Sequence, residues 1–128
     1  MKLRIKGNSL RLRLTQSEIQ EFQEKGIVQE VIKFGITPLQ RMNYIIQQFD
    51  GKEVIASFDS NTMTVNVPKP IAENWVTTNQ VGVENRMEIN NEEDLFILIE
   101  KDFQCLKPRP GEDESEMFPN PSEEILKC

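Results

Sequence analysis

The fold of this chain is indicated most clearly by the stretch VIASFDSNTMTVNV, residues 54–67. Apolar residues alternate on both sides of the pair Ser60-Asn61, as in two strands that each bury one face. A two-residue turn at this pair would join the strands as an antiparallel hairpin. In that register the alternate apolar side chains share one face, and a one-residue slip would expose all of them. These side chains are Val54, Ala56, Phe58, Met63, Val65 and Val67.

A second alternation, KLRIKGNSLRLRL, occupies residues 2–14 and centres on Gly7-Asn8. A turn there would pair Ile5 with Leu10 on the inner face and place Arg4 opposite Arg11 on the outer face. Like charges opposite one another are mildly destabilising, so this outer face favours an anion nearby. A bulged continuous strand at Gly7 is the alternative.

Two helices are expected, each next to a hairpin. Residues 15–18 have the S/T-x-x-E form of a capping box, and Gly26 marks the end of a helix of about ten residues. Pro68 and Pro70 open a second, short helix with Trp75 on its apolar side. Further strands are expected near 28–34, 44–49, 81–83 and 95–103. The chain shows no internal sequence repeat.

These elements predict a single α+β domain over residues 1–105. We expect a twisted antiparallel sheet of about six to eight strands with two short helices, and a partly open barrel is an alternative closure. Residues 106–128 are rich in proline and acidic residues, which predicts a C-terminal tail or extended arm.

The net charge of −6 is unevenly distributed. Residues 1–41 carry eight basic and four acidic residues (8 − 4 = +4), and the remainder carries seven and seventeen (7 − 17 = −10). No signal peptide or membrane span is visible, so we expect a cytoplasmic protein with free thiols at its two cysteines. The absence of histidine excludes Ser-His-Asp and Cys-His catalysis and every histidine-containing metal site within these 128 residues.

The basic outer face of the first hairpin is the first candidate site. Its candidate anion- or partner-binding residues are Arg4, Lys6, Arg11 and Arg13. Arginine on a strand can hold phosphate oxygens through two nitrogens at once. An ordinary solvated face, or a sheet edge protected by its charges, is the competing interpretation. In a third interpretation the acidic tail lies across this face, within the molecule or in a dimer.

A second candidate is the carboxylate pair Glu100 and Asp102, which would share one face of a strand, with Cys105 nearby. Paired carboxylates can bind Mg²⁺ or Ca²⁺ or divide acid and base roles, and a thiolate can act as a nucleophile or ligand. A polar strand end with a buried free cysteine is the competing interpretation, because an acidic neighbourhood disfavours the thiolate.

The tail offers a third candidate. Residues 112–116, EDESE, lack the spacing of an EF-hand and suggest a solvated or partner-binding tail. Phe118 lies between proline-rich flanks and could anchor the tail, either on a neighbouring surface or on its own domain.

Two family resemblances accompany these patterns. Residues 5–14, IKGNSLRLRL, within a match of about residues 1–25, resemble the opening of AbrB-type swapped-hairpin regulators and MazE-type antitoxins. That resemblance implies a DNA-binding dimer, although Thr15 replaces the usual proline and the acidic remainder departs from the family.

Over nearly its full length, the chain resembles a family of small uncharacterised bacterial proteins, a domain of unknown function. The similar segments are IKGNSLRLR (5–13), LIEKDFQCL (98–106), EDE (112–114) and FPNP (118–121). This resemblance implies a bacterial cytosolic protein and supplies no activity, cofactor or partner.

We therefore expect a non-enzymatic binding or interaction module, without a cofactor, that uses the basic hairpin face. The expected partner is a protein or an anionic ligand rather than a membrane, and the chain is expected to be a monomer or homodimer. A small metal- or carboxylate-dependent enzyme using Glu100 and Asp102 is the alternative. An AbrB-like DNA-binding dimer ranks lower, because the net charge of −6 opposes nucleic acid binding.

Overall fold

The computed structural model of the chain describes residues 1–103 and Phe118. In chain order the elements are β1 (Lys2–Ile5), β2 (Ser9–Leu14), α1 (Gln16–Lys25), β3 (Ile27–Lys33), the 3₁₀ turn η1 (Pro38–Gln40), β4 (Arg41–Phe49), β5 (Ile55–Asp59), β6 (Thr62–Pro68), α2 (Lys69–Thr77), β7 (Gly82–Glu88) and β8 (Asp94–Lys101). None of the described helices is long and apolar enough to cross a membrane.

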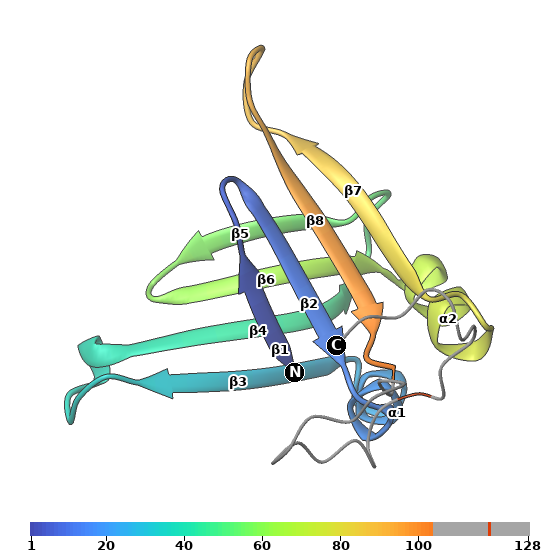
Figure 1. Ribbon diagram of the computed structural model, residues 1–128, viewed down its shortest axis with the longest axis horizontal. Coiled ribbons are helices and arrows are strands. Elements are labelled where there is room, and N and C mark those ends of the chain that lie inside the picture. Colours follow the sequence, from blue (N-terminus) through green and yellow to red (C-terminus); the bar gives the residue numbers. More distant parts are fainter. Residues whose placement is uncertain (104–117, 119–128) are drawn as a thin grey trace.

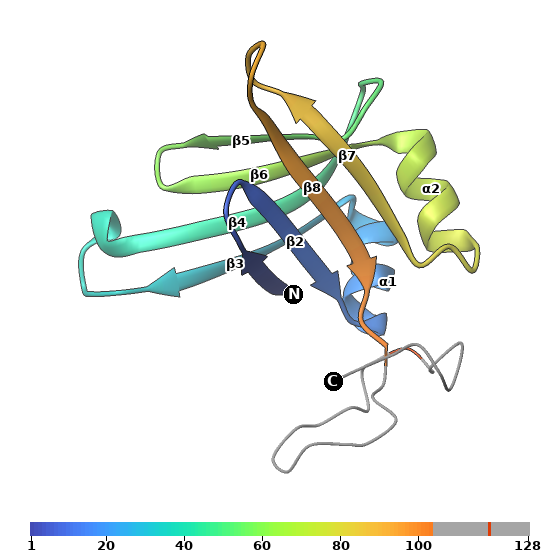
Figure 2. The same cartoon turned by 45° about the horizontal axis from the view of Figure 1, so that its top comes forward.

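The strands form two four-stranded sheets, which confirms the α+β class and corrects the expected single antiparallel sheet. Sheet A has the order β1-β2-β8-β7 and sheet B the order β3-β4-β6-β5. The central pairs β2–β8 and β4–β6 are parallel, so both sheets are mixed. Sheet A crosses over sheet B, and the helices lie together at one end (Figure 1). The view in Figure 2 shows the two sheets as separate layers rather than a closed barrel.

Both predicted hairpins have the expected registers. Ile5 pairs with Leu10 across the β1–β2 turn, and Phe58 pairs with Met63 across the β5–β6 turn. Ser60 and Asn61 both have positive φ, as a type I′ turn requires. The expectation that Phe58 is buried is wrong, because 70% of its surface is exposed. It lies next to the β5–β6 turn, at the end of its strand.

The two halves of the chain repeat one order of elements, which the sequence analysis missed. The first half runs β1-β2-α1-β3-β4 and the second β5-β6-α2-β7-β8, and each half supplies one hairpin to each sheet. Buried residues at equivalent places in the two halves lie 53 positions apart in the sequence. Three such pairs are Phe22 with Trp75, Leu12 with Val65, and Ile46 with Ile99. The repeat conserves burial and topology but not residue identity, so residue matching does not detect it.

The core lies between the inner faces of the sheets and the two helices. Phe22 of α1 and Trp75 of α2 are fully buried and meet edge to face, with ring centroids 6.0 Å apart. The indole nitrogen of Trp75 donates to the carbonyl of Val81 at 3.1 Å, which satisfies its only donor in the core. The predicted capping box at Thr15 and the left-handed Gly26 at the end of α1 are both present.

A polar cluster closes the core beside the start of the chain. The amino group of Met1 contacts the carboxylates of Glu18 and Glu30, and the Tyr44 hydroxyl donates to Glu30 at 2.9 Å. Burial by itself lowers the pKa of the amino group, but its hydrogen bonds to Glu18 and Glu30 outweigh burial and raise it. Burial and the hydrogen bond to Glu30 together raise the pKa of Tyr44 to about 12.

This cluster predicts an alkaline limit to stability. The pKa of Tyr44 rises from 10.0 to about 12 on folding, so between these values the folded chain holds a proton that the unfolded chain releases. The free energy of unfolding should therefore fall as the pH rises through this window, and the contribution is fully present below pH 10. Urea titrations from pH 9 to 12 measure the slope, which Tyr44→Phe should flatten. A slope unchanged by that substitution would contradict the prediction.

Candidate anion-binding face

The outer face of sheet A carries the cations that the alternation predicts. Leu12 and Leu14 of β2 are fully buried, so the alternate residues Arg11 and Arg13 project to the opposite side. In β1, Arg4 lies directly opposite Arg11 in the antiparallel register. The hairpin therefore presents its cations together on one solvent-facing surface.

Glu100 of β8 lies between the two arginines of β2. Its carboxylate oxygen Oε1 accepts from Nε of Arg11 at 2.6 Å and from Nε of Arg13 at 2.7 Å. A second nitrogen of Arg11 lies 2.5 Å from the same oxygen. The parallel register places Glu100 beside Arg13, so this contact depends on β2 and β8 being neighbours. One carboxylate thus offsets part of the repulsion between two half-buried guanidinium groups.

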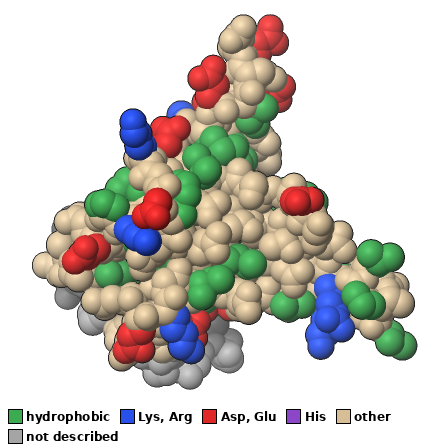
Figure 3. All heavy atoms as spheres, turned by 180° about the vertical axis from the view of Figure 1, so that it is seen from behind, with side chains coloured by type: hydrophobic (Ala, Val, Ile, Leu, Met, Phe, Trp, Pro, Cys, Tyr) green, Lys and Arg blue, Asp and Glu red, His purple; other side chains and the backbone are tan. Residues whose placement is uncertain are grey.

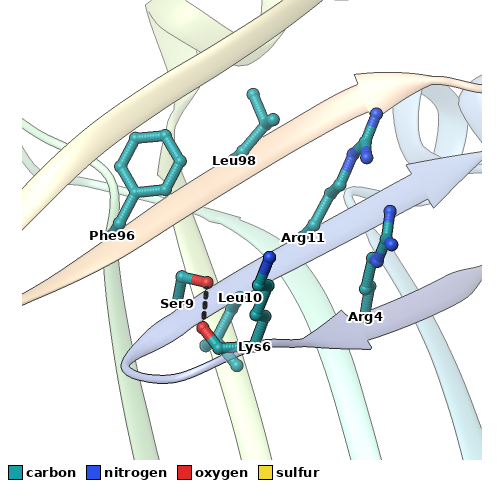
Figure 4. A pocket seen from close by; sticks show the side chains of 7 residues that line it. All are labelled: Arg4, Lys6, Ser9, Leu10, Arg11, Phe96 and Leu98. Carbon is teal, nitrogen blue, oxygen red and sulfur yellow. Dashed lines mark hydrogen bonds between the residues drawn. The ribbon is translucent and has the colours of Figure 1, made fainter.

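A hollow of about 290 Å³ lies beside this ion pair on the outer face. Figure 4 shows Arg4, Lys6 and Arg11 rising from the hairpin to the same side, next to the side chains of β8. The hollow is lined by Arg4, Lys6, Ser9, Leu10, Arg11, Phe96 and Leu98. It therefore combines a cationic wall with an apolar one.

Two of these cations lack an acidic partner. Among the described residues, Arg4 and Lys6 form no ion pair, whereas Arg11 is held by Glu100. The turn that carries Lys6 is fixed, because the hydroxyl of Ser9 donates to the Lys6 carbonyl at 2.5 Å. The structure therefore places two cations without an acidic partner among residues 1–103 and Phe118 beside an apolar wall.

Sequence reasoning missed the apolar wall formed by Phe96 and Leu98, and it missed Arg86, which packs on the Phe96 ring. Phe96 and Leu98 share the parity of Glu100 on β8, so the period-two pattern could have placed them on the outer face. The guanidinium of Arg86 lies 5.0 Å from the centre of the Phe96 ring and 3.6 Å from Asp94. The pairing of β8 with β2 and β7 brings Phe96 beside the basic hairpin and Arg86, and the local sequence contains no signal of this pairing.

The carboxylates Glu100 and Asp102 are held by separate cations. Glu100 accepts from the arginines, whereas Asp102 is buried with one oxygen 3.1 Å from Nζ of Lys2. Within residues 1–103 and Phe118, no three metal-ligating side chains cluster. Cys105, the third candidate of that group, lies outside the described residues.

Phe118 lies against the end of sheet A, at the opposite end of β8 from the turn that carries Lys6. Its ring meets that of Phe103 edge to face at 5.5 Å, and its backbone nitrogen donates to the carbonyl of Asp102 at 2.6 Å. Nζ of Lys101 lies 5.5 Å from the centre of the Phe118 ring. The acidic cluster 112–116 lies outside the described residues.

Lys101 is a buried cation whose geometry supports a structural role. Burial lowers the pKa of its amino group. Its Nζ donates to the carbonyl of Thr78 at the end of α2, where the helix dipole favours a positive charge. The equivalent position in the first half, Gln48, likewise donates to a carbonyl of the last turn of α1, that of Phe22.

Comparison with known proteins identifies the family of the chain, and the function of that family is unknown. Neither the curated proteins nor the solved structures include one that matches this chain. One family model, described as a family of unknown function (DUF7009), matches residues 1–122. This match spans both sheets, both helices and Phe118, so the chain belongs to the family of unknown function DUF7009.

Proposed function

We propose that this chain is a binding module that holds an anionic partner on the outer face of sheet A. The observation that carries the proposal is the hollow where Arg4, Lys6 and Arg11 converge beside Phe96 and Leu98. Arg4 and Lys6 face it without an acidic partner among the described residues, so an anion there gains charge-assisted hydrogen bonds without displacing an internal one.

The shape of the hollow supports binding rather than catalysis. Its charged lining consists of cations, and Glu100 beside it is engaged by two arginines. General acid–base chemistry needs a group that can exchange a proton near neutral pH, which arginine does not do and lysine does not ordinarily do. The arrangement is suited to orienting phosphate or carboxylate oxygens against a sheet with an apolar wall.

Reversing the charges of Arg4 and Lys6 tests this proposal. Arg4→Glu with Lys6→Glu should weaken binding of fluorescent inorganic polyphosphate by at least about tenfold at low salt. The slope of log affinity against log salt should flatten by about one for each cation removed. Fluorescence anisotropy measures both, and a glutamate-rich peptide in parallel separates phosphate from carboxylate recognition.

The matched control makes the same change in net charge at positions away from the hollow. Lys25→Glu with Lys69→Glu changes net charge equally at two exposed lysines on the helices. Equal losses in both double variants would reduce the effect to net charge and overturn the proposal, as would a wild-type chain that binds neither probe.

A further inference from the structure

The connection between β3 and β4 exposes large apolar side chains at one end of the molecule. This apolar tip, residues 34–40, holds Phe34, Ile36 and Leu39 at 73%, 95% and 85% exposure. Figure 3 shows apolar and basic side chains together at the end of sheet B that carries this connection. Contiguous apolar side chains held in solvent mark an interaction surface.

The tip is ordered by its own hydrogen bonds. Gln40 accepts from the backbone and hydroxyl of Thr37 at 3.2 Å, and its backbone nitrogen donates back to the Thr37 carbonyl. The backbone nitrogen of Phe34 donates to the Gln40 carbonyl, and Asn61 of the β5–β6 turn donates to the Leu39 carbonyl. The protein thus holds these apolar side chains outward in a defined conformation.

An apolar recess opens beside the tip. This cleft of about 370 Å³ lies between the diverging inner faces of the two sheets. Ser57 is its one polar lining residue, and the others are Ile5, Leu10, Met42, Ala56, Phe58, Met63, Met87 and Leu95. Three methionines line it, and methionine side chains adapt readily to the shape of a partner.

Charge distinguishes the tip from the far rim of the cleft. Lys33 and Arg41 pair across β3 and β4 at the base of the tip, and neither forms an ion pair with a described residue. Beyond the Met87–Leu95 pair of the cleft, the β7–β8 connection is acidic. This acidic rim comprises Glu88, Glu92, Glu93 and Asp94, of which Asp94 alone pairs with a described cation.

We infer that a second copy of this chain occupies the cleft, with the tip of each copy seated in the cleft of the other. Apolar projection then meets apolar recess, and the cations Lys33 and Arg41 meet the acidic rim. The arrangement uses each complementary pair twice about a two-fold axis, which closes the assembly at two copies. The cleft opens between the two sheets and the proposed anion site lies on the outer face of sheet A, with Leu10 lining both.

The test is the mass of the chain in solution. Multi-angle light scattering over a wide concentration range should give twice 14.9 kDa for the wild type. Ile36→Asp with Leu39→Asp should give a monomer with an unchanged circular dichroism spectrum, because both side chains are exposed in one copy. Val31→Asp is the matched control, because Val31 is exposed on β3 but does not line the cleft.

Charge exchange adds a test that loss of folding cannot imitate. Lys33→Glu with Arg41→Glu should weaken the dimer at least about tenfold, and adding Glu92→Lys with Glu93→Lys should restore it. A wild type that stays monomeric at every concentration overturns the inference, whether or not its cleft takes up a fatty acid or another protein. So does a dimer that Val31→Asp disrupts and the tip variant leaves intact.

Discussion

Trp75→Ala should lower the free energy of unfolding by about 3–5 kcal/mol, the usual cost of truncating a fully buried large aromatic side chain. The substitution removes the ring that meets Phe22 and opens a cavity between α1 and α2. It also removes the donor to the Val81 carbonyl, at the point where α2 leads into β7. A loss of this size is a large share of the stability of a domain of this length.

Urea denaturation followed by circular dichroism measures this loss. Phe58→Ala is the matched control, because it truncates an aromatic ring that is 70% exposed and should cost less than about 1 kcal/mol. Phe22→Ala combined with Trp75→Ala should cost less than the two separate losses together, since the rings are in contact. Equal effects of Trp75→Ala and Phe58→Ala would show that the helix pair does not support the core.

Glu100→Gln should lower the stability of the fold and raise the affinity for polyphosphate. Without the carboxylate, Arg11 and Arg13 lie side by side on β2 without their shared counterion, which should cost about 1–2 kcal/mol of stability, between the values for exposed and buried ion pairs. The released guanidinium of Arg11 already lines the hollow, so affinity for polyphosphate should rise by about tenfold, as for one added charge-assisted hydrogen bond.

The same anisotropy and denaturation measurements separate these effects. Glu84→Gln is the matched control, because Glu84 pairs with Leu98 on the same sheet but forms no ion pair with a described residue. It should leave stability unchanged and raise affinity less than Glu100→Gln does. If the two variants bind polyphosphate alike, the position of Glu100 between the arginines does not govern the anion site.

The local parts of the fold were predictable from the sequence. Alternation around Ser60-Asn61 and Gly7-Asn8 determines both hairpin registers, because the turn and the buried face must agree. The helix from Gln16 to Lys25 follows from its capping box and from Gly26. Each of these signals lies within about ten residues of the structure it specifies.

The sheet partners were not predictable in this way. Parallel pairing of β2 with β8 joins residues such as Leu12 and Ile99 through two intervening hairpins and two helices. No turn links them, so the sequence contains no local signal of their adjacency. The duplication escaped notice for a related reason, since Phe22 and Trp75 are equivalent in place and burial but not in chemistry.

The candidate site shows the same division. The cations on the first hairpin could be assigned to one face because they alternate within one strand pair. The sequence offers Glu100 either as a metal-binding or catalytic candidate with Asp102 or as part of a polar strand end, and in the structure its carboxylate accepts from Arg11 and Arg13. That relation depends on the β2–β8 pairing, as does the presence of Phe96 beside the basic hairpin.

Because each half of the chain supplies one hairpin to each sheet, the topology also limits when the chain can fold during synthesis. The β1–β2 hairpin leaves the ribosome well before its neighbour in sheet A, which is β8, near residue 100. Until β8 emerges, the edge of β2 that pairs with it has no strand partner, and residues 1–50 cannot complete either sheet alone. Folding should therefore be a late, all-or-none event governed by distant contacts, and a nascent chain stalled before β8 should remain open to proteases and chaperones.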